Sequence, residues 1–446
     1  MNMRVIIFIS CLLCAIYSCN NRKDYAKITQ NPLLFTNTVH ELNDIVMGNN
    51  FGPIVASRNY FYASIAAYEI IAAGYPERYH SLAGQLHGLN KIPAPIPNKK
   101  IDFDFAALLS FCSLGEAVTF PAGSMRAYTD SLKQLVKAHG MPEDVFSNTI
   151  AFADTVSAVI FSWSKKDNYA ESRSYPKYSV TDSPGRWVPT PPAYADAMEP
   201  HWNSIRSAVV DSVNQFIPPP PYLFNVKDTN SPYYLEVKKI KDKVDSLTAE
   251  ETEIADFWDD NSFKLNVSGH VMFSTKKFSP GGHWMSIAGI AAQKSGADFP
   301  KTVYGFAKTA IALYDAFIEC WNIKYIYNTL RPETAINKYI DPEWRPHLQT
   351  PPFPEYTCGH CTISAASAEV LASVYGDQFA YPDSTENEFG IETRKYNSFR
   401  DAAKETMRSR YYGGIHYLYC CERSYVMGTG IGDLIVDKLK MDVKHQ

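Results

Sequence analysis

Apolar residues recur at helical spacing over several long segments of this 446-residue chain, and this pattern constrains the fold more than any other feature. A three- and four-residue spacing places apolar side chains on one face of an α-helix. Alternating strand patterns bounded by turn residues are scarce. The chain is therefore predicted to be all-α. The segments that carry the helical pattern are 56–74, 143–163, 234–247, 304–328 and 362–376.

Composition excludes two classes of protein. Hydrophobic residues make up 46% of the chain and aromatic residues 13%, which excludes a disordered protein and predicts a large core. The formal net charge of −4 gives no electrostatic support for nucleic-acid binding. The sequence therefore offers no support for a nucleic-acid partner.

Proline-rich stretches divide the chain. They fall at 91–100, between about 165 and 195, and at 217–222. Such stretches interrupt helices and favour loops. We predict an N-terminal helical half over 19–216 and a C-terminal helical half over 217–446.

The first 18 residues resemble a lipoprotein-type signal peptide, with an early cation at Arg4, an apolar stretch, and Ser18 before Cys19. Cys19 is the predicted lipidation site, and its lipid is the predicted membrane contact. The alternatives are a cleaved secretory signal and an uncleaved anchor. The expected location is the bacterial cell envelope, in the periplasm or at the cell surface.

Two cations near the end of one long helical pattern form the first candidate site. Lys324 and Arg331 are seven residues apart, and Pro332 follows. On a continuous helix, two turns would point both side chains the same way. Two converging cations suit an oxyanion such as phosphate, although one such pair alone usually marks a solvated face.

The second candidate is the segment "TCGHC" before the helical pattern at 362–376. Gly359 and His360 would present backbone amides at a helix N-terminus, which favours an anion. His360 could equally be a capping or core residue. A redox site at Cys358 and Cys361 would need strands alternating with helices, and the pattern on both sides is helical.

The third candidate lies in "RSRYYGGIHYLYCC". Arg410 closes a helical pattern, Gly413 and Gly414 break it, and His416 opens the next apolar run. The glycine turn could bring the cation and the imidazole to a common point.

Together, these segments resemble the split signature of the superfamily of type 2 phosphatidic acid phosphatases and vanadium-dependent haloperoxidases. That signature is K-x6-R-P, then S-G-H, then S-R-x5-H. The likeness extends to the segments 56–69, 189–202, 257–261 and 280–292, which are similar to the soluble bacterial haloperoxidase-like branch. It implies helical bundles, similar to those of vanadium chloroperoxidase, that enclose an oxyanion pocket. The matching positions are Lys324, Arg331, Pro332, Gly359, His360, Arg410 and His416.

The resemblance also implies residue roles. Lys324, Arg331 and Arg410 would hold the equatorial oxygens of phosphate or vanadate, and Gly359 would add a backbone donor. His416 would be the nucleophile on phosphorus or the axial ligand of vanadium. His360 would be the acid that protonates the leaving group.

Three functions are expected from this resemblance. The leading one is an acid-phosphatase-like hydrolase of a phosphomonoester, with a phosphohistidine at His416 and no cofactor. The alternatives are a vanadium-dependent haloperoxidase with vanadate on His416, and a non-catalytic homologue that binds phosphate or another oxyanion.

The chain departs from the signature at two positions. Cys358 stands where the family has an oxyanion-binding serine, and a thiol is a weaker donor. Cys420 stands where the family has an aspartate that orients the histidine. Cys358 and Cys420 could form a disulfide, contribute two thiols to the site, or fill space in a decayed site. Restoring a carboxylate by Cys420→Asp is predicted to raise activity. Neither Cys361 nor Cys421 has a predicted role.

His283 could form a metal cluster with Asp259, Asp260 and His270 upstream. The spacing matches no compact metal-ligand motif, so packing and capping are the preferred roles.

Overall fold

The structure is a computed structural model that describes residues 24–181, 183–262 and 264–443. The predicted signal peptide and lipidation site lie outside the described residues, so the lipid anchor and the envelope location stay predictions. The boundary near residue 217 also stays a prediction.

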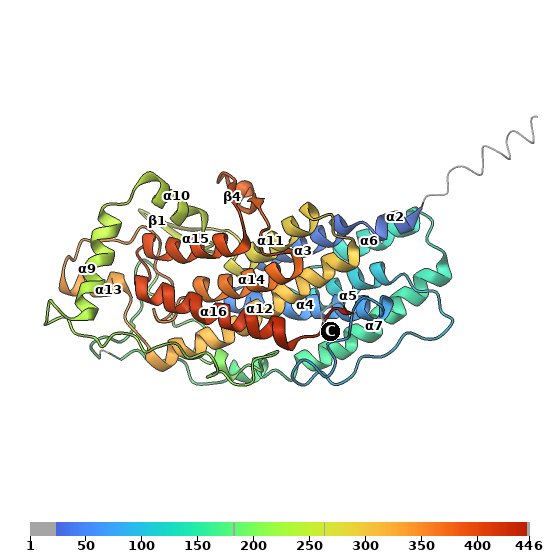
Figure 1. Ribbon diagram of the computed structural model, residues 1–446, viewed down its shortest axis with the longest axis horizontal. Coiled ribbons are helices and arrows are strands. Elements are labelled where there is room, and N and C mark those ends of the chain that lie inside the picture. Colours follow the sequence, from blue (N-terminus) through green and yellow to red (C-terminus); the bar gives the residue numbers. More distant parts are fainter. Residues whose placement is uncertain (1–23, 182, 263, 444–446) are drawn as a thin grey trace, which may run out of the picture.

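Helices dominate the described residues, which confirms the all-α prediction (Figure 1). The elements before residue 217 are α2 (Tyr25–Thr29), α3 (Pro32–Gly48), α4 (Pro53–Gly74), α5 (Phe103–Ala117), α6 (Arg126–Ala138), α7 (Glu143–Ser164), α8 (Tyr169–Ser172) and the 3-10 helix η1 (Trp202–Ser204). The helices after it are α9 (Pro232–Asp245), α10 (Ala249–Phe257), α11 (Pro280–Lys294), α12 (Phe299–Tyr327), α13 (Pro332–Tyr339), α14 (Gly359–Tyr375), the 3-10 helix η2 (Thr385–Phe389), α15 (Phe399–Tyr412) and α16 (Leu418–Lys438).

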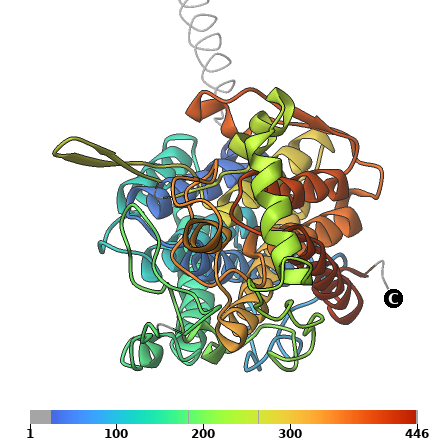
Figure 2. The ribbon, with the colours of Figure 1, turned by 90° about the vertical axis from the view of Figure 1, so that its left-hand side faces the viewer.

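Two short antiparallel hairpins complete the described elements. They are β1 (Lys264–Ser268) with β2 (Val271–Thr275), and β3 (Tyr381–Asp383) with β4 (Arg394–Tyr396). Lys264 pairs with Thr275 in the first hairpin, and Tyr381 pairs with Tyr396 in the second. The end view in Figure 2 shows the first hairpin projecting from the helical body.

The long helix α12 lies at the centre of the core. Its side chains are buried from Thr302 to Lys324, and it packs against α4, α14, α11 and α16. Asp298 caps its N-terminus by accepting a hydrogen bond from the amide of Lys301, and Pro300 lies in its first turn. Helices from both sides of residue 217 therefore share one apolar core. By length and composition alone, the segment Glu143–Ser172 could cross a membrane, and its helix α7 packs here on α5 and α4.

Helices α14 and α16 pack closely because a glycine lies at their contact. A Cβ on Gly428 would overlap the carbonyl oxygen of Thr362 and lie 2.9 Å from the Cβ of Ala365. Both helices carry residues of the predicted site, so this contact also sets their spacing.

We expect Gly428→Ala to lower the free energy of unfolding by about 1–3 kcal/mol, because the added methyl group overpacks a filled contact. Urea denaturation measures the change. Gly48→Ala is the matched control, since Gly48 ends α3 and a Cβ there meets nothing within 4 Å. Equal stability of the two variants would contradict the assigned role of Gly428.

Candidate active site

Four of the predicted site residues line a cavity of about 400 Å³, and they are Gly359, His360, Arg410 and His416. Its polar lining comes from the N-terminus of α14, the end of α15, the loop before α16, and the segments 259–262 and 349–350. Apolar side chains from distant segments form most of the remaining wall. Among the lining residues are Phe51, Met198, Phe317, Trp321, Phe353, Gly359, His360, Arg410 and His416.

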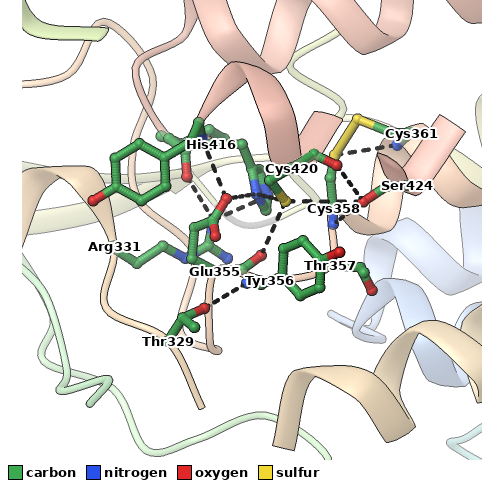
Figure 3. A network of polar contacts seen from close by, with 12 residues as sticks. Thr329, Arg331, Glu355, Tyr356, Thr357, Cys358, Cys361, His416, Cys420 and Ser424 are labelled. Carbon is green, nitrogen blue, oxygen red and sulfur yellow. Dashed lines mark hydrogen bonds and ion pairs between the residues drawn. A yellow bond between two sulfur atoms is a disulfide. The ribbon is translucent and has the colours of Figure 1, made fainter. Parts of the chain in front are cut away.

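His416 lies just before α16, with 2% of its surface exposed. Its Nδ1 is 3.0 Å from Oε1 of Glu355, and its Nε2 is 3.0 Å from Nη1 of Arg331 (Figure 3). Burial, reinforced by Arg331 and Lys324, holds the pKa of His416 well below its usual value. The ring is therefore neutral at pH 7. A proton on Nδ1 donates to Glu355, so the lone pair lies on Nε2, where it accepts a hydrogen bond from Nη1 of Arg331. An oxyanion that used this lone pair as a ligand or nucleophile would have to displace that contact.

Arg331 reaches the site from a different local structure than the sequence predicts. Helix α12 ends at Tyr327, Asn328 adopts a left-handed conformation with φ 49°, and Arg331 is the N-cap residue of α13. The expectation of two successive turns on one helix was wrong, because a left-handed asparagine can terminate a helix. Arg331 Nε donates to the carbonyl of Phe353 at 2.9 Å, and Nη1 donates to the carbonyl of Ile415 at 2.8 Å.

The buried guanidinium groups of Arg331 and Arg410 each have N–H donors without a hydrogen-bond partner among the described residues. Nη2 of Arg331, and Nε and Nη2 of Arg410, have no hydrogen-bond partner among the described residues. Arg410 is otherwise held by its Nη1, which donates to the carbonyl of Trp258 at 2.8 Å. Unpaired buried donors are costly unless a ligand satisfies them. These donors near the lone pair of His416 fit a tetrahedral oxyanion such as phosphate or vanadate.

Lys324 supports the site in a different way from the one expected. Its ammonium group donates to the carbonyls of Pro354 at 2.8 Å, Glu355 at 3.1 Å and Thr357. These contacts use its three N–H groups, so an oxyanion would have to displace one carbonyl to bind it. Burial lowers the pKa of Lys324 to about 8. In this structure, Lys324 holds the loop before α14 in place.

Gly359 and His360 form the first turn of α14, as predicted. The ring of His360 lines the cavity, and its Nε2 lies 4.0 Å from Oδ2 of Asp260 and has no hydrogen-bond partner among the described residues. Burial and the charge of Arg410 hold the pKa of His360 well below its usual value. A neutral imidazole at the cavity wall can accept or deliver a proton.

The cysteines pair differently from the expectation. Cys358 forms a disulfide with Cys361, and Cys420 is free and buried. The suggested link between Cys358 and Cys420 was wrong, because the partner of Cys358 lies one helical turn along α14. The disulfide sulfur of Cys358 has no hydrogen to donate, although it accepts a hydrogen bond from the amide of Cys361 at 3.2 Å. In this form, its side chain cannot replace the donor hydroxyl of the family serine.

We expect peptide mapping by mass spectrometry to confirm this pairing. When the denatured protein is alkylated without reductant, label should appear on the four cysteines that are free among residues 24–443 and be absent from Cys358 and Cys361. Prior reduction, the control, should add label at both. Label on Cys358 before reduction, or a peptide linked through Cys420, would contradict the structure. The four free residues are Cys112, Cys320, Cys420 and Cys421.

His283 belongs to a buried ionic network beside the cavity. Its Nδ1 lies 2.7 Å from Asp260, its Nε2 lies 3.0 Å from Asp383, and its ring stacks on Trp258. Burial opposes protonation, but the two carboxylates hold the pKa of His283 well above its usual value. Both ring nitrogens contact carboxylates, and a metal ion would have to displace one of these contacts to bind His283. His283 therefore forms ion pairs that the predicted roles of packing and capping do not include. His270 is not part of this network and lies on the exposed turn between β1 and β2.

Sequence reasoning missed Glu355. Its carboxylate is fully buried and accepts hydrogen bonds from Nδ1 of His416 at 3.0 Å and from the amide of Tyr417 at 3.2 Å. Burial raises its pKa to about 7. The available signal was an isolated acid in the apolar, proline-rich segment "PPFPEYTC".

The fold and the site define an all-α protein in which two buried arginines with unpaired donors lie near a neutral histidine. The family model "VCPO second helical-bundle domain" matches residues 305–445. The structure of a bacterial vanadium-dependent iodoperoxidase is 42% identical, covers 92% of this chain and 97% of its own, and has a TM-score of 0.86. The chain belongs to the superfamily of vanadium-dependent haloperoxidases and type 2 phosphatidic acid phosphatases, as its motifs predict.

More distant structures share the fold. The apo form of a bacterial vanadium-dependent chloroperoxidase is 16% identical, covers 87% of this chain and 94% of its own, and has a TM-score of 0.64. The holo form is also 16% identical, covers 87% and 93%, and has a TM-score of 0.62. A comparison with curated proteins found no significant match.

Proposed function

We propose that this protein is a vanadium-dependent haloperoxidase that oxidises iodide with hydrogen peroxide. The observation that carries the proposal is the set of unpaired donors on Arg331 and Arg410 near the neutral His416. That arrangement suits phosphate as well as vanadate. Similarity over nearly the whole chain to a vanadium-dependent iodoperoxidase favours the peroxidase over the phosphomonoester hydrolase expected first from the sequence.

The residues present fit vanadate. Arg331 and Arg410 would donate to its oxygens, the first turn of α14 would add a backbone donor at Gly359, and Nε2 of His416 would be its protein ligand. Bound vanadate would supply the Lewis-acid activation of peroxide toward a halide.

The protein's own groups would manage protons and water. His360 would take a proton from the incoming peroxide, and its Nε2 is unpaired and faces Asp260 across 4.0 Å. The apolar side chains of Phe353 and Trp321 line the cavity and would limit the access of water. Arg410 is held by backbone carbonyls and needs little rearrangement to meet an anion.

The test is to assay the purified chain, stripped of oxyanions, with and without added vanadate. We expect oxidation of iodide by peroxide, followed as triiodide absorbance, only when vanadate is present, with inorganic phosphate as a competitor. Hydrolysis of p-nitrophenyl phosphate is measured in parallel. Phosphate release without any halide oxidation would contradict the proposal and favour the hydrolase. Vanadate binding without either reaction would favour the non-catalytic homologue.

A further inference from the structure

We propose that Glu355 is the positioning residue of His416 and supplies, from the loop before α14, the carboxylate that position 420 lacks. The inference rests on the proposed oxyanion site and concerns how this chain aims its histidine. The family resemblance places the orienting carboxylate one helical turn after the histidine, where this chain has Cys420.

The geometry around Nδ1 of His416 carries the proposal. Figure 3 shows Glu355 and Cys420 on the same side of the ring. Oε1 of Glu355 is 3.0 Å from Nδ1, within hydrogen-bond distance of a nitrogen donor, whereas Sγ of Cys420 is 3.6 Å away and sulfur is a weak acceptor. The same oxygen also accepts the amide of Tyr417, so it holds both the ring and the chain that follows it.

The loop that carries Glu355 is itself fixed by the cations of the site. Arg331 Nε donates to the carbonyl of Phe353, and Lys324 donates to the carbonyls of Pro354 and Glu355. The position of the carboxylate is therefore coupled to Arg331, which has a free donor for the oxyanion. Cys420 is fully buried, and its sulfur lies 3.9 Å from the carbonyl oxygen of Glu355.

This arrangement reverses the expectation for Cys420→Asp. The sequence alone predicts that a carboxylate at 420 raises activity. In the folded protein, that change would place a second buried carboxylate near the one on Glu355, and like charges at such a site oppose each other. We expect Cys420→Asp alone to weaken oxyanion binding. In a protein that already carries Glu355→Gln, we expect the same substitution to strengthen oxyanion binding.

The experiment measures the affinity of the oxyanion-free full chain for inorganic phosphate by titration calorimetry. The variants are Glu355→Gln, Cys420→Asp and the two combined, with thermal denaturation as a check on folding. Glu69→Gln is the matched control. Glu69 is likewise buried, accepts a backbone amide (from Leu82) and has a pKa raised by burial to about 7, but it lies on α4 away from the cavity.

We expect Glu355→Gln to weaken phosphate binding by about 10- to 100-fold, the usual effect of losing a group that orients a ligand, while Glu69→Gln leaves it unchanged. The double variant should recover most of the loss, because it again has one carboxylate facing Nδ1. If Glu355 had only a structural role, an aspartate at position 420 would not restore the phosphate affinity lost in Glu355→Gln. Wild-type affinity in Glu355→Gln, or a folded double variant without recovery, would overturn the proposal.

Phosphate as the probe separates this inference from the proposed function. If the chain binds phosphate with the expected pattern but does not oxidise halide, the peroxidase proposal fails and the role of Glu355 stands. If halide is oxidised and Glu355→Gln binds phosphate like wild type, the peroxidase proposal stands and the role of Glu355 fails. Absence of phosphate binding by the wild-type chain would overturn the role of Glu355 as well.

Discussion

His416→Ala should abolish vanadate-dependent oxidation of iodide, lowering kcat/KM by on the order of 10³-fold or more. The substitution removes the only group near Arg331 Nη1 that offers a neutral nitrogen lone pair among the described residues. It also leaves the buried carboxylate of Glu355 without its imidazole partner. Steady-state kinetics with saturating vanadate measure the loss, and calorimetry measures the accompanying loss of vanadate affinity.

A histidine outside the site provides the control for this prediction. His139 caps the end of α6, where its Nδ1 lies 2.8 Å from the carbonyl of Leu135, and His139→Ala should keep full activity. Thermal denaturation of both variants checks that each remains folded. Substantial turnover in a folded His416→Ala would place the reaction elsewhere in the molecule.

Arg410→Lys should lower kcat by roughly 10²- to 10³-fold, the cost found when one donor to a developing oxyanion is removed. The substitution keeps the positive charge. It loses the planar group whose Nη1 holds the carbonyl of Trp258 while Nε and Nη2 remain free for the ligand. From one position, a lysine ammonium cannot donate both to the carbonyl of Trp258 and to the ligand.

The same helix supplies the control. Arg400 also lies on α15, but it is partly exposed and pairs with Glu369 and Asp377. Arg400→Lys should change kcat little, because a surface ion pair contributes little and makes no contact with the cavity. Similar effects of the two substitutions would mean that the loss reflects the helix and not the free donors of Arg410.

Much of the fold and part of the site could be predicted from the chain itself. The helical pattern at 304–328 corresponds to α12, and the pattern at 362–376 to α14, because periodic apolar residues are a local property. Gly359 and His360 were expected at a helix start, and α14 begins there. Arg331 was placed on the wrong element, although Asn328 and Pro332 are both residues that commonly mark the end of one helix and the start of the next.

The motifs by themselves determined the class of the protein and its set of cations and histidines, since residue type and spacing survive in the sequence. Only the tertiary structure decided what each group contacts. It placed Lys324 on backbone carbonyls, joined Cys358 to Cys361, and brought Glu355 to His416 across 61 positions of the chain. Such contacts depend on how distant loops pack around buried charge, and no local pattern records which of several nearby acids or thiols will meet a given imidazole.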